Sequence, residues 1–331
     1  MNPPESPPRD LLGRFRTWLL WGMAGAALIY LGASIWAGLD DMRAALTIFW
    51  WPLYIPAILL TLLNYGLRFW KWQYLLRRVG VVISLRENAT IFLAGLAMVI
   101  SPAKAGELLK PYLVRVRTGV PMHQTLPVLV TERLTDAIAC LGLASISVGR
   151  FAGDSVAYVW GPVAVLAVGL GVLAHRGLSL GILRLIARIP GVGRIATRLE
   201  EMSLAMRTCV APVPFLLTVG ASFLAWGGEC VGYWLMFKGF GIDASLEACT
   251  FIYAFATVAG GATPLPGGLG VADGALVVWA EALIPGVDRS VALASAILIR
   301  LATLWLGVLL GAVALLQLGA VLDEPAPTDR T

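Results

Sequence analysis

The sequence predicts an all-α polytopic membrane protein built from two inverted repeats, each with three spanning helices and one re-entrant helical hairpin. The membrane class follows from composition: 58% of the 331 residues are hydrophobic, 14% are charged and the mean hydropathy is +0.80. The repeat follows from two similar stretches, SPAKAGE at 101–107 and TPLPGGLG at 263–270. Duplicated units that break helices with Pro and Gly are typical of transporters assembled from repeats.

The similarity extends beyond these two stretches. Gly80 and Ser84 correspond to Gly241 and Ser245 at one constant offset of 161 residues, and Arg133 corresponds to Arg300 after a longer insertion. The predicted membrane domain covers 15–322, with repeat 1 at about 15–150 and repeat 2 at about 155–322. Residues 1–14 and 323–331 are Pro-rich and polar, which predicts disordered cytoplasmic termini.

Six apolar runs predict the spanning helices. About twenty residues cross a hydrocarbon core of about 30 Å, and four uncharged runs have this length: 17–39, 44–67, 155–174 and 208–228. Two more spans carry charges. The span 121–149 contains Glu132, Arg133 and Asp136, and the span 290–321 contains Arg300.

The remaining apolar regions, 88–118 and 247–285, contain the repeated motif and predict the hairpins. Glu107, Lys110 and two arginines follow the break at Pro102, and each ionised residue at mid-bilayer costs about 2.5–3.5 kcal/mol or more. A hairpin of two half-helices is therefore favoured over a spanning helix. Irregular backbone at membrane depth is tolerated where it is buried or lines a cavity, so the hairpins should border a binding site.

Positive charge predicts the orientation. With the N-terminus inside, nineteen of the 25 Lys and Arg face the cytoplasm, nine of them between Arg68 and Arg117. This predicts that both termini are cytoplasmic, that the first hairpin opens inward and that the second opens outward. The expected location is a bacterial inner membrane. The basic segment 176–207 is interpreted as an interfacial amphipathic helix or a loop that enforces topology.

Several functional classes find no support. The basic residues are spread over loops on one side of the membrane, so nucleic-acid binding is not expected. The four cysteines and two histidines lack metal-ligand or triad spacing, so we expect no metal, cofactor or catalytic residue.

A phosphate group is the predicted ligand, because helix N-termini near the motif glycines present unpaired N–H groups and a positive dipole end. The candidate ligands are Lys104, Gly106, Glu107, Lys110, Arg133, Asp136, Thr263, Gly267, Gly268, Asp273 and Arg300. Two further acids are candidates for ion or proton coupling: Glu132 and Glu229.

Each candidate also has a structural interpretation. Arg133 can pair with Asp136, Lys104 can extend to the interface, and the Gly-rich stretch can serve close packing. Arg300 has no acid within helical reach, so its balance must come from the substrate or from a tertiary partner. The candidates for that partner are Asp273, Glu229 and Glu281.

The motifs PAKAGE, ERLTD and PLPGGLG resemble those of the flippase-like membrane domain of lysylphosphatidylglycerol synthases, over roughly 15–320. The resemblance implies movement of a lipid between leaflets. The candidate partners are lipid-synthesis enzymes and a second copy of the chain. The chain ends before an aminoacyl-transferase domain could begin, so we expect no lysyl-lipid synthesis, and Asp273 stands where the family pattern has Glu. The alternatives are an enzyme that modifies a lipid phosphate and a non-transporting partner in lipid or glycolipid synthesis.

Overall fold

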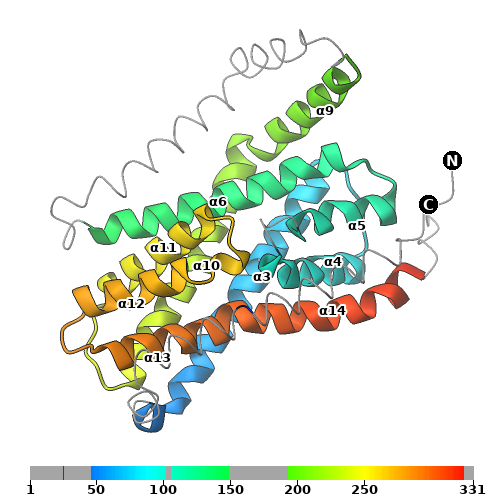
Figure 1. Ribbon diagram of the computed structural model, residues 1–331. Coiled ribbons are helices and arrows are strands. Elements are labelled where there is room, and N and C mark those ends of the chain that lie inside the picture. The colour runs from blue at the N-terminus through cyan, green and yellow to red at the C-terminus, as the bar shows by residue number, and fades with distance from the viewer. Residues whose placement is uncertain (1–24, 26–45, 102–105, 149–192, 324–331) are drawn as a thin grey trace.

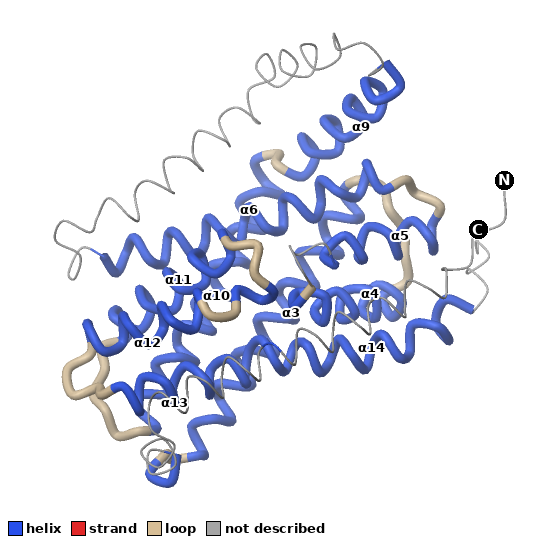
Figure 2. The backbone as a smooth tube through the Cα atoms, in the orientation of Figure 1, coloured by secondary structure: helices blue, strands red, loops and turns tan. Residues whose placement is uncertain are grey.

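The described part of the protein consists of helices joined by loops. The computed structural model describes residues 25, 46–101, 106–148 and 193–323, and within these ranges there are α-helices and no strand (Figure 2). The predicted spans 17–39 and 155–174, the residues Pro102 and Lys104, and most of the basic segment lie outside the described residues. The helices are α3 Tyr54–Arg78, α4 Leu85–Ala97, α5 Leu109–Thr118, α6 Met122–Val148, α9 Gly193–Cys209, α10 Pro212–Gly239, α11 Leu246–Ala262, α12 Val271–Leu283, α13 Arg289–Arg300 and α14 Leu306–Asp323 (Figure 1).

Shorter helical elements connect these helices. They include the 3₁₀ helices η1 Trp51–Leu53, η2 Met98–Ile100 and η5 Pro266–Gly268 and the π-helix η6 Leu301–Trp305. The π-helix joins α13 to α14 without a break in the chain's course. Because π-helical turns cluster at functional sites, the position of η6 directly after Arg300 points to this part of the chain as a candidate site.

The repeated sequence folds into repeated local structure. Gly80 and Gly241 follow the ends of α3 and α10 and have φ of +83° and +73°, a conformation that glycine adopts without steric cost. Ser84 and Ser245 then cap α4 and α11, each accepting a hydrogen bond from a backbone N–H three residues on. The same helix-turn-cap unit therefore begins both hairpin regions.

The two halves are interlocked. Helix α3 packs against α10, while α4 of the first half packs against α14 of the second, and α11 of the second packs against α6 of the first (Figure 1). Glycine permits the α4–α14 approach, since a Cβ atom at Gly311 would lie 2.4 Å from the backbone of Ala97. Neither half therefore forms a separate unit.

Both predicted hairpin regions are helices interrupted at the repeated motif. Helices α4 and α12 have 13 residues each, so each is roughly 20 Å long, less than the thickness of a hydrocarbon core. Figure 1 shows α4 and α5 toward one end of the bundle and α11 and α12 toward the other. The interruptions meet in the middle, where η2 contacts η5.

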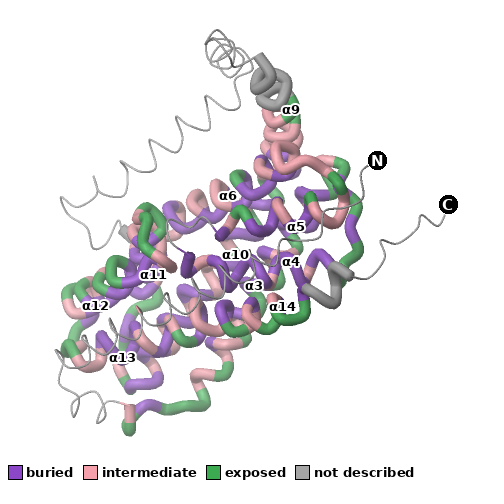
Figure 3. Tube along the Cα trace, turned by 45° about the vertical axis from the view of Figure 1, so that its right-hand side comes forward, coloured by how far each residue is buried: buried purple, intermediate pink, exposed green. Residues whose placement is uncertain are grey.

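Three described helical stretches are long and apolar enough to cross a membrane: Trp51–Arg78, Pro212–Gly239 and Arg289–Leu318. Large apolar side chains face outward on them, including Leu224 on α10 and Leu316 on α14, which are 67% and 86% exposed. Buried residues line the inward surfaces of the bundle (Figure 3). Such an apolar exterior suits contact with lipid.

One sequence interpretation is corrected. The predicted span 44–67 ends too early, because α3 continues to Arg78 and carries Arg68 and Lys71 inside the bundle. Lys110, also counted among the cytoplasmic charges, is 3% exposed. These cations are accommodated because carboxylates on α6 lie beside them. A search for uncharged runs overlooks such helices, because it rejects any segment that carries charge.

Candidate functional site

A cavity of about 550 Å³ lies where the two halves meet. Its wall includes residues from α3, α6, α10, both interrupted hairpins and the helix that follows Arg300. Among the lining residues are Tyr65, Arg68, Glu107, Arg133, Asp136, Trp226, Glu229, Tyr253, Gly267, Gly268, Arg300 and Thr303. Seven predicted site residues thus share one cavity: Glu107, Arg133, Asp136, Glu229, Gly267, Gly268 and Arg300.

The two halves make equivalent ion pairs at this cavity. In the first half Arg133 Nε lies 2.8 Å from Glu107 Oε2, and in the second Arg300 Nε lies 2.9 Å from Asp273 Oδ1. Each pair ties the long last helix of a half to that half's own hairpin. The acids therefore have a positioning role: they fix where each arginine stands beside the cavity.

Asp273 is the tertiary partner that Arg300 requires. Its other carboxylate oxygen accepts a hydrogen bond of 2.8 Å from the N–H of Gly270, and Arg300 also donates to the carbonyl oxygen of Gly267 at 2.7 Å. The arginine thereby closes the Gly-rich turn onto α13. For Arg133, the predicted helical partner Asp136 lies at 3.8 Å, so Glu107 is the closer acid.

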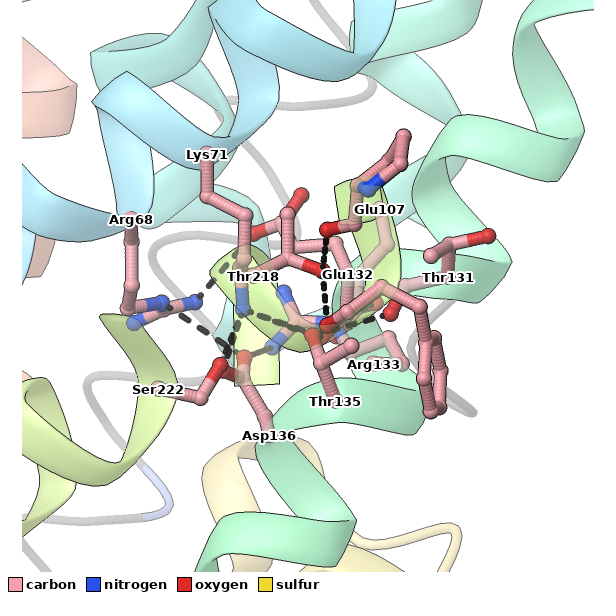
Figure 4. Close-up of polar contacts among 12 residues, drawn as sticks. Arg68, Lys71, Glu107, Thr131, Glu132, Arg133, Thr135, Asp136, Thr218 and Ser222 are labelled. Atoms are coloured by element: carbon pink, nitrogen blue, oxygen red, sulfur yellow. Dashed lines mark hydrogen bonds and ion pairs between the residues drawn. The ribbon is translucent and has the colours of Figure 1, made fainter. Parts of the chain in front are cut away.

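A second group of charges surrounds α6 and is shown in Figure 4. Lys71 Nζ lies 2.6 Å from Asp136 Oδ1 and also donates to the hydroxyl oxygens of Thr135 and Ser222. Arg68 lies between two acids, with nitrogen–oxygen distances of 3.8 Å to Glu132 and to Asp136. This group links α3, α6 and α10 at the base of the cavity.

Lys110 and Glu132 lie behind the cavity and do not line it. Lys110 Nζ is 2.5 Å from Glu132 Oε2 and 4.3 Å from the centre of the Trp72 ring. Glu132 is fully buried. Both side chains are buried and paired with each other, so their contacts are those of a structural ion pair. A buried ion pair persists only where its geometry is good and further hydrogen bonds are present.

The predicted small residues also have internal contacts. The N–H of Gly106 donates to the Ser101 hydroxyl at 2.7 Å, so this donor is satisfied within the protein. Thr263 donates its hydroxyl to the carbonyl of Gly260. Gly268, at φ +67°, faces Gly260 so closely that a Cβ atom would lie 2.9 Å from its Cα. Close packing therefore explains part of the Gly-rich motif.

Glu229 is the most isolated acid of the cavity. Its Oε2 accepts a hydrogen bond of 2.7 Å from the Tyr253 hydroxyl, and no ion pair with a described Lys or Arg is present within 4.0 Å. Arg68 occupies the corresponding position in the other half, again at an offset of 161. The two equivalent positions thus place opposite charges on one cavity.

Sequence reasoning missed several lining residues. Arg68 was assigned to a loop, although its alignment with Glu229 was a signal that both positions carry charge for a shared reason. Trp226, Tyr65 and Tyr253 gave no sequence signal, because aromatic residues are common in membrane helices. Tyr65 donates its hydroxyl to the carbonyl of Thr303 within the π-helix that follows Arg300.

Comparison with known proteins gives consistent results. The family model described as lysylphosphatidylglycerol synthase TM region matches residues 22–311. Two proteins of Methanothermobacter thermautotrophicus, both called UPF0104 membrane protein, are 24% and 25% identical, covering 82% and 90% of this chain and 88% and 93% of their own lengths. Glycosyltransferase AglD of Haloferax volcanii is 26% identical over 73% of this chain and 45% of its own length.

Proposed function

This chain belongs to the family of the lysylphosphatidylglycerol synthase TM region, and on that basis we propose that it moves a lipid with an anionic or phosphate-bearing headgroup between membrane leaflets. The family assignment supports a protein with several membrane helices and a lipid-related role. Movement between leaflets, residence in a bacterial inner membrane and cytoplasmic termini are the specific parts of the proposal.

The observation that carries this proposal is the cavity at the junction of the two halves. Both hairpins and both arginines, Arg133 and Arg300, border it, and each arginine is held by an acid of its own hairpin. In our interpretation the hairpins are re-entrant and open to opposite faces of the membrane. Two such equivalent elements around one site would allow the site to open to either face in turn.

Charge explains why a lipid would use this route. A headgroup that crosses unaided loses its hydration in a core about 30 Å thick, and an ionised group there is costly. The cavity offers the guanidinium groups of Arg68, Arg133 and Arg300 inside the helix bundle. The apolar tails remain outside, against surfaces such as that of Leu316.

The test is leaflet exchange in liposomes that contain the purified protein. We expect the parent to accelerate exchange of a labelled anionic phospholipid, and Arg300→Ala to abolish the acceleration because the second hairpin loses its tie. Arg289→Ala is the matched control, since Arg289 lies on the same helix but its side chain is 49% exposed. Exchange no faster than in empty liposomes, across a panel of lipid headgroups, would sink the proposal.

A second candidate is a role in lipid or glycolipid synthesis, supported by the similarity to the protein named glycosyltransferase AglD. In that case the chain acts on a lipid phosphate or assists a synthase as a non-transporting partner. Incubation with candidate lipids followed by mass spectrometry separates the candidates. A transporter leaves the lipid mass unchanged, whereas an enzyme changes it, and a non-transporting partner changes neither mass nor leaflet.

A further inference from the structure

The charges at the cavity balance only when Glu229 is ionised. Among the described residues that line it, three are cationic and three are acidic: Arg68, Arg133 and Arg300, and Glu107, Asp136 and Glu229. The charged side chains that join this group from outside the lining also balance, two against two: Lys71 and Lys110, and Glu132 and Asp273. A proton on Glu229 would therefore leave the described group with one net positive charge.

Glu229 differs from the other acids of this group in its nearest partner. Each of the other four lies within 2.9 Å of a lysine or arginine: Glu107 of Arg133, Glu132 of Lys110, Asp136 of Lys71 and Asp273 of Arg300. Glu229 instead accepts its 2.7 Å hydrogen bond from the neutral Tyr253 hydroxyl, with no described Lys or Arg within 4.0 Å. A close cation holds a carboxylate in its ionised form, so Glu229 is the acid of this group that is free to change charge.

The surroundings of Glu229 suit both of its protonation states. The Tyr253 hydroxyl donates to Oε2, which stabilises the carboxylate and leaves Oε1 to carry a proton. Guanidinium groups on the same cavity favour the ionised form, whereas burial and the carboxylate of Asp136 favour the neutral form. The described titratable and charged groups around Glu229 come from each helix packed beside it: Tyr65 and Arg68 on α3, Asp136 and Cys140 on α6, Cys230 on α10 itself, Tyr253 on α11 and Arg300 on α13.

A proton fits this position better than a metal cation. A metal ion would need several oxygen ligands, but Glu229 is the one described acid of the group without a close cation, and guanidinium groups line the same cavity. A proton needs a single oxygen. The cavity of about 550 Å³ has room for the water that would deliver it.

We propose that Glu229 is the proton-binding site of this cavity and that one proton accompanies each anionic headgroup that the protein moves. The inference rests on the proposed function and adds the ion that drives it. With Glu229 neutral, the group carries one positive charge and favours an anion; with Glu229 ionised, the group is balanced and releases the anion. Binding of the proton and binding of the anion therefore strengthen each other. The proton is taken from water on the side where the headgroup enters and is released on the other side.

Infrared difference spectroscopy of the full chain in detergent micelles tests proton binding without any transport step. Between about pH 6 and about pH 9, above the titration of ordinary carboxyl groups, the parent should show a protonated carboxyl band that disappears as pH rises. Glu229→Gln should abolish this band, because the amide oxygen still accepts from Tyr253 but the side chain cannot ionise. The matched control is Glu281→Gln, which should keep the band, since Glu281 is 29% exposed and pairs with Arg289 away from the cavity. An unchanged band in Glu229→Gln, or no pH-dependent band in the parent, would overturn the inference.

Leaflet distribution under a pH gradient tests the coupling. Liposomes carry a trace of labelled anionic phospholipid and a pH difference of one unit, and empty liposomes give the background. A proton and a monovalent anion move together without net charge, so in the parent the label should collect in the leaflet that faces the alkaline side, up to about tenfold at equilibrium. Glu281→Gln should behave like the parent. Glu229→Gln should leave the label evenly distributed, and a sodium gradient in place of the pH gradient should have no effect on the parent.

Tyr253→Phe supplies an independent variant that keeps the carboxyl group. It removes the donor that stabilises the ionised form, so the infrared band should disappear at a higher pH than in the parent, a shift that a purely structural role would not produce. An unchanged midpoint would contradict the assignment, also where Glu229→Gln does not fold. A titrating Glu229 without leaflet exchange would refute the proposed function and leave the proton site standing. Exchange that ignores the pH gradient, or follows it equally in Glu229→Gln, would refute the coupling and leave the proposed function standing.

Discussion

Replacement of Asp273 by asparagine should destabilise the second half strongly. The side chains of Asp273 and Arg300 are 10% and 13% exposed, and Asp273 bonds both Arg300 and the N–H of Gly270. Removing one partner of a buried pair typically costs about 3–5 kcal/mol, because the other charge is left without compensation. At roughly 2 °C per kcal/mol for a domain of this size, Asp273→Asn should lower Tm by about 6–10 °C.

Thermal unfolding of the purified protein, followed by tryptophan fluorescence, measures this effect. Asp243→Asn is the matched control, since Asp243 also pairs with a lysine, Lys238 at 2.5 Å, but its side chain is 96% exposed. A solvated pair of this kind should give no measurable fall in Tm. The double variant Arg300→Gln with Asp273→Asn should recover part of the loss. Equal Tm values for Asp273→Asn and Asp243→Asn would refute the reasoning about the buried tie.

Three further predictions concern packing, burial and pH. Gly268→Ala should lower stability by about 1–3 kcal/mol, because a Cβ atom there would lie 2.9 Å from Gly260. Gly274→Ala, with open space around it inside α12, should keep or slightly raise stability in the same unfolding assay. Lys71→Met should cost about 3–5 kcal/mol, because the 1%-exposed ammonium is the closest counter-charge of a buried carboxylate on α6, and a stability like that of the parent would contradict this. Asp288 caps α13, and its hydrogen bond from a backbone N–H holds its pKa below the usual range. A lowered pKa stabilises the folded state above the unfolded value of about 4, so the Tm difference between parent and Asp288→Ala should shrink from about pH 6 to about pH 3, and a constant difference would argue against the cap.

The helical class and the helix interruption at the second copy of the repeated motif were predictable from sequence because their signals are local. Pro264, Pro266 and the following glycines interrupt an apolar run, and η5 forms there. The paired serines, Ser84 and Ser245, mark helix starts through hydrogen bonds to backbone three residues away, so a repeat in sequence becomes a repeat in structure. The family resemblance is confirmed by the match over residues 22–311.

The charged interior was less predictable, because its members are brought together by tertiary packing. In the sequence, Arg68 and Lys71 look like loop residues beside an apolar run. Their contacts with acids on α6 become visible only when α3 is packed against α6 and α10. The partner of Arg300 could be narrowed to three acids by sequence, but the choice of Asp273 depended on how the Gly-rich turn folds back on α13. The role of Lys104 stays a prediction, since this residue lies outside the described part of the chain.

The central claim is that this cavity carries a phospholipid headgroup across the membrane. The most direct measurement is the rate of leaflet exchange of a labelled anionic phospholipid in liposomes, with the parent, Arg300→Ala and Arg289→Ala compared at equal protein content. We expect the parent and Arg289→Ala to exceed empty liposomes, with Arg300→Ala close to the empty level and the lipid mass unchanged in all. Equal exchange in the parent and in empty liposomes, or a changed lipid mass, would contradict the claim.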